Sequence, residues 1–191
     1  MNVEDNDDFI KHLTSEQPLE VLLRGHLWVE AELIAVLEDA LPFPTQIDLG
    51  RFSFPQKVSL VAAHGFIRSE DMPGYMKLNS LRNKVAHNLA AEPNEEYARE
   101  LLNSFGPHLK HLVGALSNQP DLHWDEWVWR LRYAILALHI SLGSERQRLA
   151  EYRMQVQHAN AKLRASAQHL LDVTSRQAEH RSWQAQDKDD A

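Results

Sequence analysis

The stretch Leu78-Asn79-Ser80-Leu81-Arg82-Asn83-Lys84-Val85-Ala86-His87-Asn88 predicts the end of an amphipathic helix. Its apolar residues recur at the spacing of one helix face and are therefore expected to point into a core: Leu78, Leu81, Val85 and Leu89. Asn88 is a typical C-terminal cap, and Pro93 follows too closely for the helix to continue. We therefore expect this helix to end near His87.

Three polar residues gather at this helix end. Asn83 and His87 are four residues apart and share one face, and the long side chain of Arg82 can reach over the end of the helix. Together they offer a fixed cation, an amide and an imidazole that titrates near neutral pH. These groups suit phosphodiester chemistry, because the cation can hold a phosphate while the histidine moves a proton. The same three residues would also serve to cap and brace the helix end, so a purely structural role is the open alternative.

The segment before this motif predicts a long helix. Thr14 or Ser15 is expected to cap it, Pro18 is tolerated in its first turn, and an apolar stripe continues to about Leu41. Glu30 interrupts the stripe. It is either a solvated glutamate or a partner that orients Arg82 or His87.

Further helices follow, joined by short loops. Ser53 and Gln56 have the spacing of a capping box and open a helix that stops at Gly65. Pro73-Gly74 is expected to break the first turn of the next segment, and Asn94 caps another helix that ends or kinks at Gly106-Pro107. Because strand-like alternation is almost absent, residues 15–120 predict an all-α bundle, preceded by an arm at residues 1–14.

The C-terminal part of the chain has a heptad pattern. Seven apolar residues recur at one position, namely Val128, Ile135, Leu142, Leu149, Val156, Leu163 and Leu170. The companion positions are Trp124, Leu131, Leu138, Glu145, Tyr152, Ala159, Ser166 and Val173. This pattern predicts a long coiled-coil helix over residues 121–180, with a disordered polar tail at 181–191. Gly143-Ser144 is a candidate joint, although the unbroken register favours a continuous helix.

An apolar seam of this length needs a partner in water. We expect the first part, up to about Leu142, to pack on the bundle and the remainder to associate with a second copy of the chain. The predicted assembly is a homodimer or a higher homo-oligomer, since the mixed seam residues are compatible with two, three or four strands. The basic residues Arg146, Arg148, Arg153 and Lys162 lie among acidic ones and predict a solvated coiled-coil surface.

The motif and the helix order together resemble a known superfamily. Arg82-Asn83, three further residues and His87 look like the Arg-x4-6-His signature of the HEPN superfamily. The helix at 22–41, the segment Phe52-Ser53-Phe54-Pro55-Gln56-Lys57 and the apolar stretch 60–67 resemble the helix order of HEPN-like proteins, with the mannitol-operon-repressor branch the most similar. The resemblance covers about residues 15–115.

The resemblance implies a metal-independent endoribonuclease of the toxin or phage-defence type. Arg82 and His87 would be catalytic residues at a site shared by two subunits, supported by Asn83, Lys84 and Glu30. The substrate would be RNA, tRNA included, with no metal and no cofactor. An antitoxin or another regulatory protein would control it. Many HEPN toxins carry a tyrosine two residues after the histidine, which the antitoxin modifies; Leu89 stands there in this chain, so control would follow another route.

Two further hypotheses compete with the nuclease. One is a non-catalytic HEPN-like regulator similar to the mannitol-operon-repressor branch, and the other is an oligomeric scaffold; both would act through protein–protein contacts. Net charge bears on the choice between an RNA-binding nuclease and a protein-binding regulator or scaffold. Residues 1–120 carry −7, residues 121–183 carry +2 and the tail carries −2. An acidic bundle excludes broad phosphate-seeking affinity, so positive potential for RNA would have to be local.

Composition restricts the remaining possibilities. The chain has no cysteine, which excludes disulfides and thiolate metal sites, and no apolar run approaches the length of a membrane span. With an acidic N-terminus unlike a targeting peptide, the protein is expected to be cytoplasmic and without a membrane partner.

His108 and His111 have zinc-ligand spacing but are more readily explained as surface histidines. His26 and His64 are either core histidines or neighbours of His87, and Trp124, Trp127 and Trp129 either anchor the long helix or stack on bases.

Overall fold

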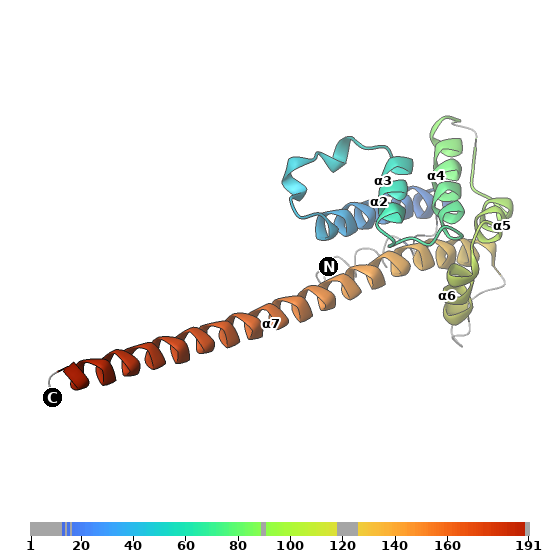
Figure 1. The fold of residues 1–191 in the computed structure, drawn as a ribbon. Coiled ribbons are helices and arrows are strands. Elements are labelled where there is room, and N and C mark those ends of the chain that lie inside the picture. The colour runs from blue at the N-terminus through green and yellow to red at the C-terminus, as the bar shows by residue number, and fades with distance from the viewer. Residues whose placement is uncertain (1–12, 14, 16, 89–90, 118–125, 190–191) are drawn as a thin grey trace. The chain divides into compact units, whose positions relative to one another are not determined.

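The structure, a computed structural model, describes Leu13, Ser15 and residues 17–88, 91–117 and 126–189, with side chains up to Thr174. All regular elements in these ranges are helical, which confirms the all-α prediction. In chain order they are α2 (Pro18–Ala40), η1 (Pro44–Gln46), η2 (Leu49–Arg51), α3 (Phe54–Ala63), α4 (Met72–Ala86), α5 (Glu95–Asn103), α6 (Pro107–Ser117) and α7 (Trp127–Asp189). The chain divides into two units, Met1–Arg148 and Leu149–Ala191. Figure 1 shows α2, α3 and α4 side by side in the first unit.

Helix α2 begins later than its capping residues suggested. Its N-cap is Gln17, which makes no side-chain capping bond, so the prediction that Ser15 is the cap is wrong; Thr14 lies outside the described residues. The Ser15 hydroxyl instead donates to Glu20 at 2.6 Å and accepts the Gln17 N–H at 3.3 Å. The start of the helix is determined by Pro18, whose fixed φ and missing N–H suit the first helical position.

The predicted caps of α3 and α5 are confirmed. Ser53 and Gln56 form the capping box, in which the Ser53 N–H donates to the Gln56 side chain at 2.8 Å. Helix α3 ends before Gly65, whose φ of +81° is a left-handed conformation that glycine adopts without strain. At α5 the Asn94 side chain accepts the Glu96 N–H at 3.0 Å.

Pro73-Gly74 does not break α4, so that prediction is wrong. The helix begins at Met72 with Pro73 in its first turn, where a missing N–H costs no hydrogen bond. Gly74 is buried, and a Cβ at this position would lie 2.8 Å from the Phe105 ring. The glycine therefore permits close packing between α4 and Phe105, which follows α5; the sequence pattern alone could not distinguish this role from a helix break.

The first part of α7 is buried in the core of the first unit. We call its fully buried large apolar residues the proximal seam: Leu131, Ile135, Leu138 and Leu142. A Cβ at Gly25 of α2 would lie 2.7 Å from the Ile135 side chain, so Ile135 packs directly against the backbone of α2. On the α4 side, the buried Tyr75 hydroxyl donates to the Leu138 carbonyl at 3.2 Å. Docking of the long helix up to Leu142 is therefore confirmed, and each seam side chain contributes about 1.5–3 kcal/mol through burial.

The boundaries of the long helix differ from those expected. Helix α7 passes through Gly143 and Ser144 without interruption and extends to Asp189, beyond the expected start of a disordered tail at residue 181. The first unit ends at Arg148, inside α7, rather than near residue 120, because the proximal seam belongs to the bundle core. Of the expected N-terminal arm, only Leu13 is described, and it is buried in the core.

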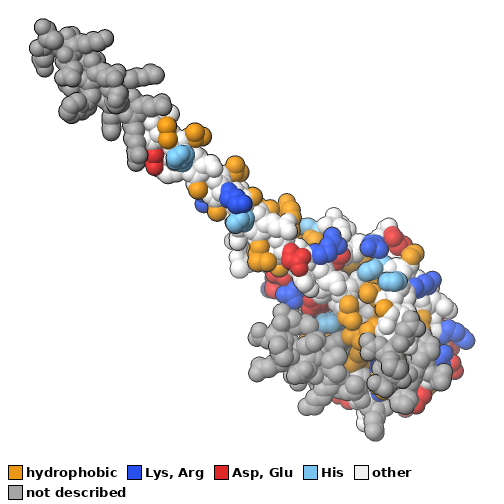
Figure 2. Space-filling model, turned by 90° about the horizontal axis from the view of Figure 1, so that it is seen from below, with side chains coloured by type: hydrophobic (Ala, Val, Ile, Leu, Met, Phe, Trp, Pro, Cys, Tyr) orange, Lys and Arg blue, Asp and Glu red, His pale blue; other side chains and the backbone are white. Residues whose placement is uncertain are grey.

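The second unit exposes apolar side chains along its helix. Residues 150–174 are all exposed, and Figure 2 shows hydrophobic side chains distributed along this unit among polar ones. The large apolar residues are 38% to 68% exposed, namely Tyr152, Met154, Val156, Leu163, Leu170, Leu171 and Val173. We call the predicted heptad positions here the distal seam: Leu149, Tyr152, Val156, Ala159, Leu163, Ser166, Leu170 and Val173. Within the described ranges, no helix combines the length and the apolar character needed to cross a bilayer.

Arg146 of α7 forms ion pairs with two carboxylates of α2. Its Nη1 lies 3.2 Å from the buried carboxylate of Glu32, and its Nε lies 2.7 Å from Asp39. These two carboxylates hold the pKa of Arg146 above its ordinary value, against the opposing effect of burial. Arg146 is thus an anchoring residue rather than part of a solvated coiled-coil surface. Arg148, which is largely exposed, pairs with Glu145 at 2.6 Å.

Replacing Arg146 should destabilise the first unit because it leaves Glu32 buried without its cation. We expect Arg146→Met to lower the free energy of unfolding by about 3 kcal/mol, measured by urea denaturation, and Glu32→Leu with Arg146→Met to recover most of the loss. The matched control is Arg148→Met, which removes an exposed ion pair and should change stability by less than about 0.5 kcal/mol. Equal losses at the two arginines would contradict the anchoring role.

Candidate functional site

The motif residues lie together at the C-terminal end of α4. The helix ends at Ala86 with His87 as its C-cap, so the predicted end is confirmed, although the cap is His87 and not Asn88. The His87 N–H closes the last turn by donating to the Asn83 carbonyl at 3.0 Å. Arg82 is half-buried and donates from Nη1 to the Asn83 side-chain oxygen at 3.1 Å, whereas His87 is exposed. One helix end therefore presents the guanidinium, the amide and the imidazole.

The charge of Arg82 is not neutralised within the described part of the chain. Its guanidinium is more than 4.0 Å from every carboxylate there, and its hydrogen bond goes to a neutral amide. A half-buried guanidinium without a counter-ion attracts anions, and its planar donors match the oxygens of a phosphate.

Two predicted supporting residues have other contacts. The exposed Lys84 places its Nζ 4.7 Å above the centre of the Tyr97 ring of α5, a cation–π contact. Glu30 pairs with Lys57 of α3 at 2.6 Å and forms no ion pair with Arg82 or His87. Glu30 is therefore a partner of a buried lysine, a contact that neither of the two roles expected for it, a solvated glutamate or a partner of Arg82 or His87, includes.

A buried histidine contacts α4 one turn before the motif. His26 of α2 is 3% exposed, and its Nε2–H donates to the Asn79 side-chain oxygen at 3.2 Å. Its ring packs on Phe54 of α3, with the ring centres 4.4 Å apart. Burial is the largest effect on His26 and lowers its pKa below the ordinary value; the positive charges of Arg82 and Lys57 act in the same direction. His26 is therefore a neutral core residue that lies close to the motif. Of the two alternatives given by the sequence, a core histidine or a neighbour of His87, the first holds.

The remaining candidates lie elsewhere or have structural contacts. His64 caps the end of α3, where its Nδ1–H donates to the Leu60 carbonyl at 2.9 Å. His108 and His111 are on α6, and the described residues contain no group of three or more potential metal ligands. Trp127 packs against the core, as an anchor would, whereas Trp124 lies outside the described residues.

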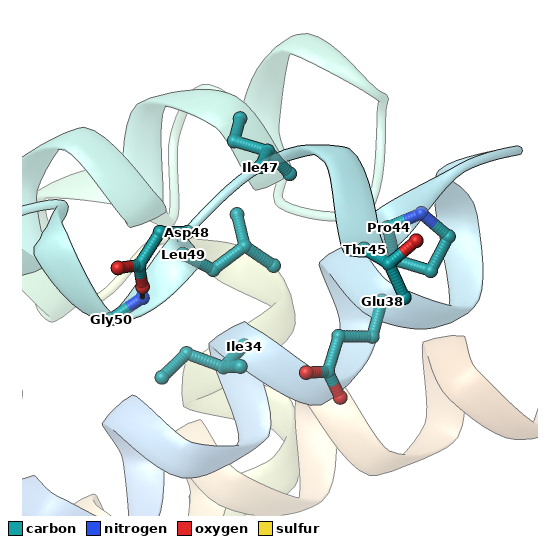
Figure 3. Close-up of a pocket in the computed structure, with 8 residues that line it drawn as sticks. All are labelled: Ile34, Glu38, Pro44, Thr45, Ile47, Asp48, Leu49 and Gly50. Carbon is teal, nitrogen blue, oxygen red and sulfur yellow. Dashed lines mark hydrogen bonds between the residues drawn. The ribbon is translucent and has the colours of Figure 1, made fainter.

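A separate open groove lies between α2 and the segment that follows it. It has a volume of about 540 Å³ and contains none of the predicted site residues. Figure 3 shows Ile34 and Glu38 on α2 and the other six lining residues on the segment 44–50. Its charged groups are the carboxylates of Glu38 and Asp48, which would repel a phosphate. The groove is therefore unsuited to the chemistry that the motif suggests.

The chain matches no protein-family model, no curated protein and no solved structure. The resemblance to the HEPN superfamily consequently rests on the motif and the helix order alone.

The sequence predicted the motif but not the contacts that α4 and Glu30 make with other helices. Asn79 precedes Arg82 by three residues and Asn83 by four, so its place on the same face could have been predicted. Its pairing with His26, and the pairing of Glu30 with Lys57, join residues 53 and 27 positions apart. No local pattern signals contacts over such separations.

A second buried histidine lies where α7 meets α2. His139 is 4% exposed, and burial lowers its pKa; the negative charge of Glu32 opposes this effect and the positive charge of Arg146 adds to it. Like His26, it accepts a proton more readily in the unfolded chain than in the folded one.

Stability should therefore decrease in acid through these two histidines. Above the ordinary histidine pKa of 6.5 both histidines are neutral in the folded and in the unfolded chain, so their protonation does not change the free energy of unfolding. As the pH falls below this value the unfolded chain binds more protons, so each histidine lowers stability by at most about 1.4 kcal/mol per pH unit. Urea denaturation between pH 5 and 8 should show a shallower slope in His26→Phe and in His139→Leu. Unchanged slopes in both variants would contradict this assignment.

Proposed function

We propose that this protein is a metal-independent endoribonuclease whose site is completed by a second copy of the chain. The observation that supports this most is the end of α4, where Arg82 lacks an ion-pair partner within the described residues and His87 is exposed on the same helix. A phosphate and a proton-transfer group can therefore meet there. The toxin or phage-defence role is the part of the proposal that follows from the HEPN resemblance.

The proposed reaction uses the RNA as its own nucleophile. One His87 takes the proton from the ribose 2′-hydroxyl, and the 2′-oxygen forms a bond to phosphorus. The bond from phosphorus to the 5′-oxygen breaks, and His87 of the partner subunit protonates that oxygen. The products are a 2′,3′-cyclic phosphate and a 5′-hydroxyl. Arg82 stabilises the charge on the phosphate. Asn83 accepts a hydrogen bond from Arg82 and so orients the guanidinium.

A second copy would bring a second Arg82 to the site. Because residues 1–120 carry −7, positive potential for RNA has to be local, and two Arg82 side chains that face each other supply more of it than one. The distal seam offers an apolar surface that could hold two copies together. Both bundles precede their seams in the chain, so this arrangement requires parallel pairing of the two helices.

RNA cleavage in chelator tests the proposal directly. We expect purified protein to cleave total RNA or tRNA in EDTA, with 2′,3′-cyclic phosphate ends, and His87→Ala to reduce the rate at least ~100-fold because proton transfer is lost. Arg82→Ala should have an effect of similar size through the loss of charge stabilisation.

The matched control is Lys110→Ala, which removes an exposed positive charge on α6 and should leave cleavage within about twofold. No cleavage of any RNA tested, or equal cleavage by wild type and His87→Ala, would exclude the nuclease.

A non-catalytic oligomeric regulator is the second candidate, and the composition of the distal seam favours it. Two small residues, Ala159 and Ser166, interrupt this seam, and parallel pairing would place Ala159 on Ala159 and Ser166 on Ser166. Antiparallel pairing gives more even layers, which pack with fewer voids: Leu149 on Val173, Tyr152 on Leu170, Val156 on Ser166 and Ala159 on Leu163. In an antiparallel pair the two Leu149 residues, which directly follow the first unit in the chain, are separated by roughly 36 Å of helix, which disfavours a shared site.

Helix orientation can be measured cleanly because the chain has no cysteine of its own. In a parallel pair Leu149→Cys faces itself and should crosslink efficiently, since a disulfide needs Cα atoms about 4–7 Å apart. In an antiparallel pair Leu149→Cys alone should not crosslink, because the two residues are separated by roughly 36 Å of helix. There, Leu149→Cys with Val173→Cys should crosslink instead. The first result supports the shared nuclease site, and the second supports the regulator.

A further inference from the structure

We propose that His26 is a positioning residue for the motif, which acts through Asn79 to fix the rotation of α4 and hence the place of Arg82 and Asn83. This inference rests on the proposed function, because it assigns His26 to the same site. His26 does not touch the substrate in this proposal, since it is 3% exposed.

The geometry connects His26 to the motif through a single helical turn. The His26 Nε2–H donates to the Asn79 oxygen at 3.2 Å, and Asn79 lies three residues before Arg82 and four before Asn83. Residues at these spacings occupy one face of a helix. Rotation of α4 about its axis would therefore break the contact between His26 and Asn79 and displace Arg82 in the same movement.

The imidazole is itself held in place from two sides. Phe54 of α3 packs against the ring, with the ring centres 4.4 Å apart, and the Nε2–H is bound to Asn79. Since Nε2 carries the hydrogen, Nδ1 is an acceptor; it is buried and has no hydrogen-bond partner among the described residues. Such a buried polar atom lowers stability relative to an apolar residue. An apolar side chain at position 26 would therefore stabilise the core better than histidine does. What histidine adds is a directional hydrogen bond to Asn79.

The hydrogen bond from His26 adds a directional contact to the apolar contacts of α4 on its α2 side. Leu78, Leu81 and Val85 are buried and turn one face of α4 toward the core. Tyr75 makes another directional contact, to the Leu138 carbonyl, but it lies near the opposite end of the helix. Toward α5, Lys77 pairs with Glu100 and Lys84 contacts the Tyr97 ring. The bond from His26 is the hydrogen bond that ties α2 to α4 within one turn of Arg82.

The experiment compares two variants that each remove one hydrogen bond from α4. His26→Phe keeps an aromatic ring against Phe54 but cannot donate to Asn79, and Tyr75→Phe removes the bond to Leu138 as the matched control. His26→Gln restores a donor and serves as the conservative rescue. Asn79→Ala removes the acceptor and tests the same contact from the other side.

The first measurement is independent of activity. Proton–nitrogen NMR spectra should show shifted or broadened signals of the Arg82 Nε–H and the Asn83 side-chain amide in His26→Phe and in Asn79→Ala. The signals should be unchanged in Tyr75→Phe and close to wild type in His26→Gln. If His26→Phe leaves both signals unchanged, or if Tyr75→Phe moves them equally, the positioning role is overturned, whatever the protein is found to cleave.

The second measurement is cleavage of RNA in EDTA. A positioning role predicts that His26→Phe lowers kcat by about 10-fold or more while KM changes less than about threefold, because the phosphate still binds but is misplaced for reaction. His26→Gln should recover most of kcat. Normal kcat in a folded His26→Phe would overturn the proposal. Shifted NMR signals in a protein that cleaves no RNA would support the positioning of Arg82 and reject the nuclease.

Discussion

The structure of the first unit depends on the burial of the proximal seam. The seam lies against α2 and contacts α4 through Tyr75, and it is covered so completely that its four residues have no exposed surface. Close approach is possible because residue 25 is a glycine, next to which Ile135 fills the space of a side chain. Without α7 the bundle would expose this interface to water, so the helix that carries the coiled-coil pattern is also part of the bundle core.

Charged and polar contacts set the geometry within this apolar frame. Arg146 ties α7 to two carboxylates of α2, and His26 ties α2 to α4 one turn before Arg82. These bonds are directional and add to the constraint from apolar packing. The motif at the end of α4 is thus supported by His26 of α2, against which Phe54 of α3 packs, although only α4 presents its reactive groups.

The local signals in the sequence predicted helix ends well where side chain and backbone interact within a few residues. The capping box at Ser53 and the Asn94 cap are of this kind. Prediction failed where a residue had two physical roles. Gly74 permits close contact with Phe105 instead of breaking a helix, and Arg146 joins carboxylates 107 and 114 positions away instead of facing solvent. Local spacing does not contain that information.

The sequence by itself determined the all-α class, the apolar stripe of α4, the clustering of Arg82, Asn83 and His87 at its end, and the heptad register of α7, because each depends on a period of a few residues. Tertiary structure decided which half of that register is buried: the proximal seam enters the core and the distal seam stays exposed. It also decided that Glu30 pairs with Lys57 and that His26 reaches Asn79. These outcomes depend on which helices meet in space, and only packing of the whole bundle brings such distant residues together.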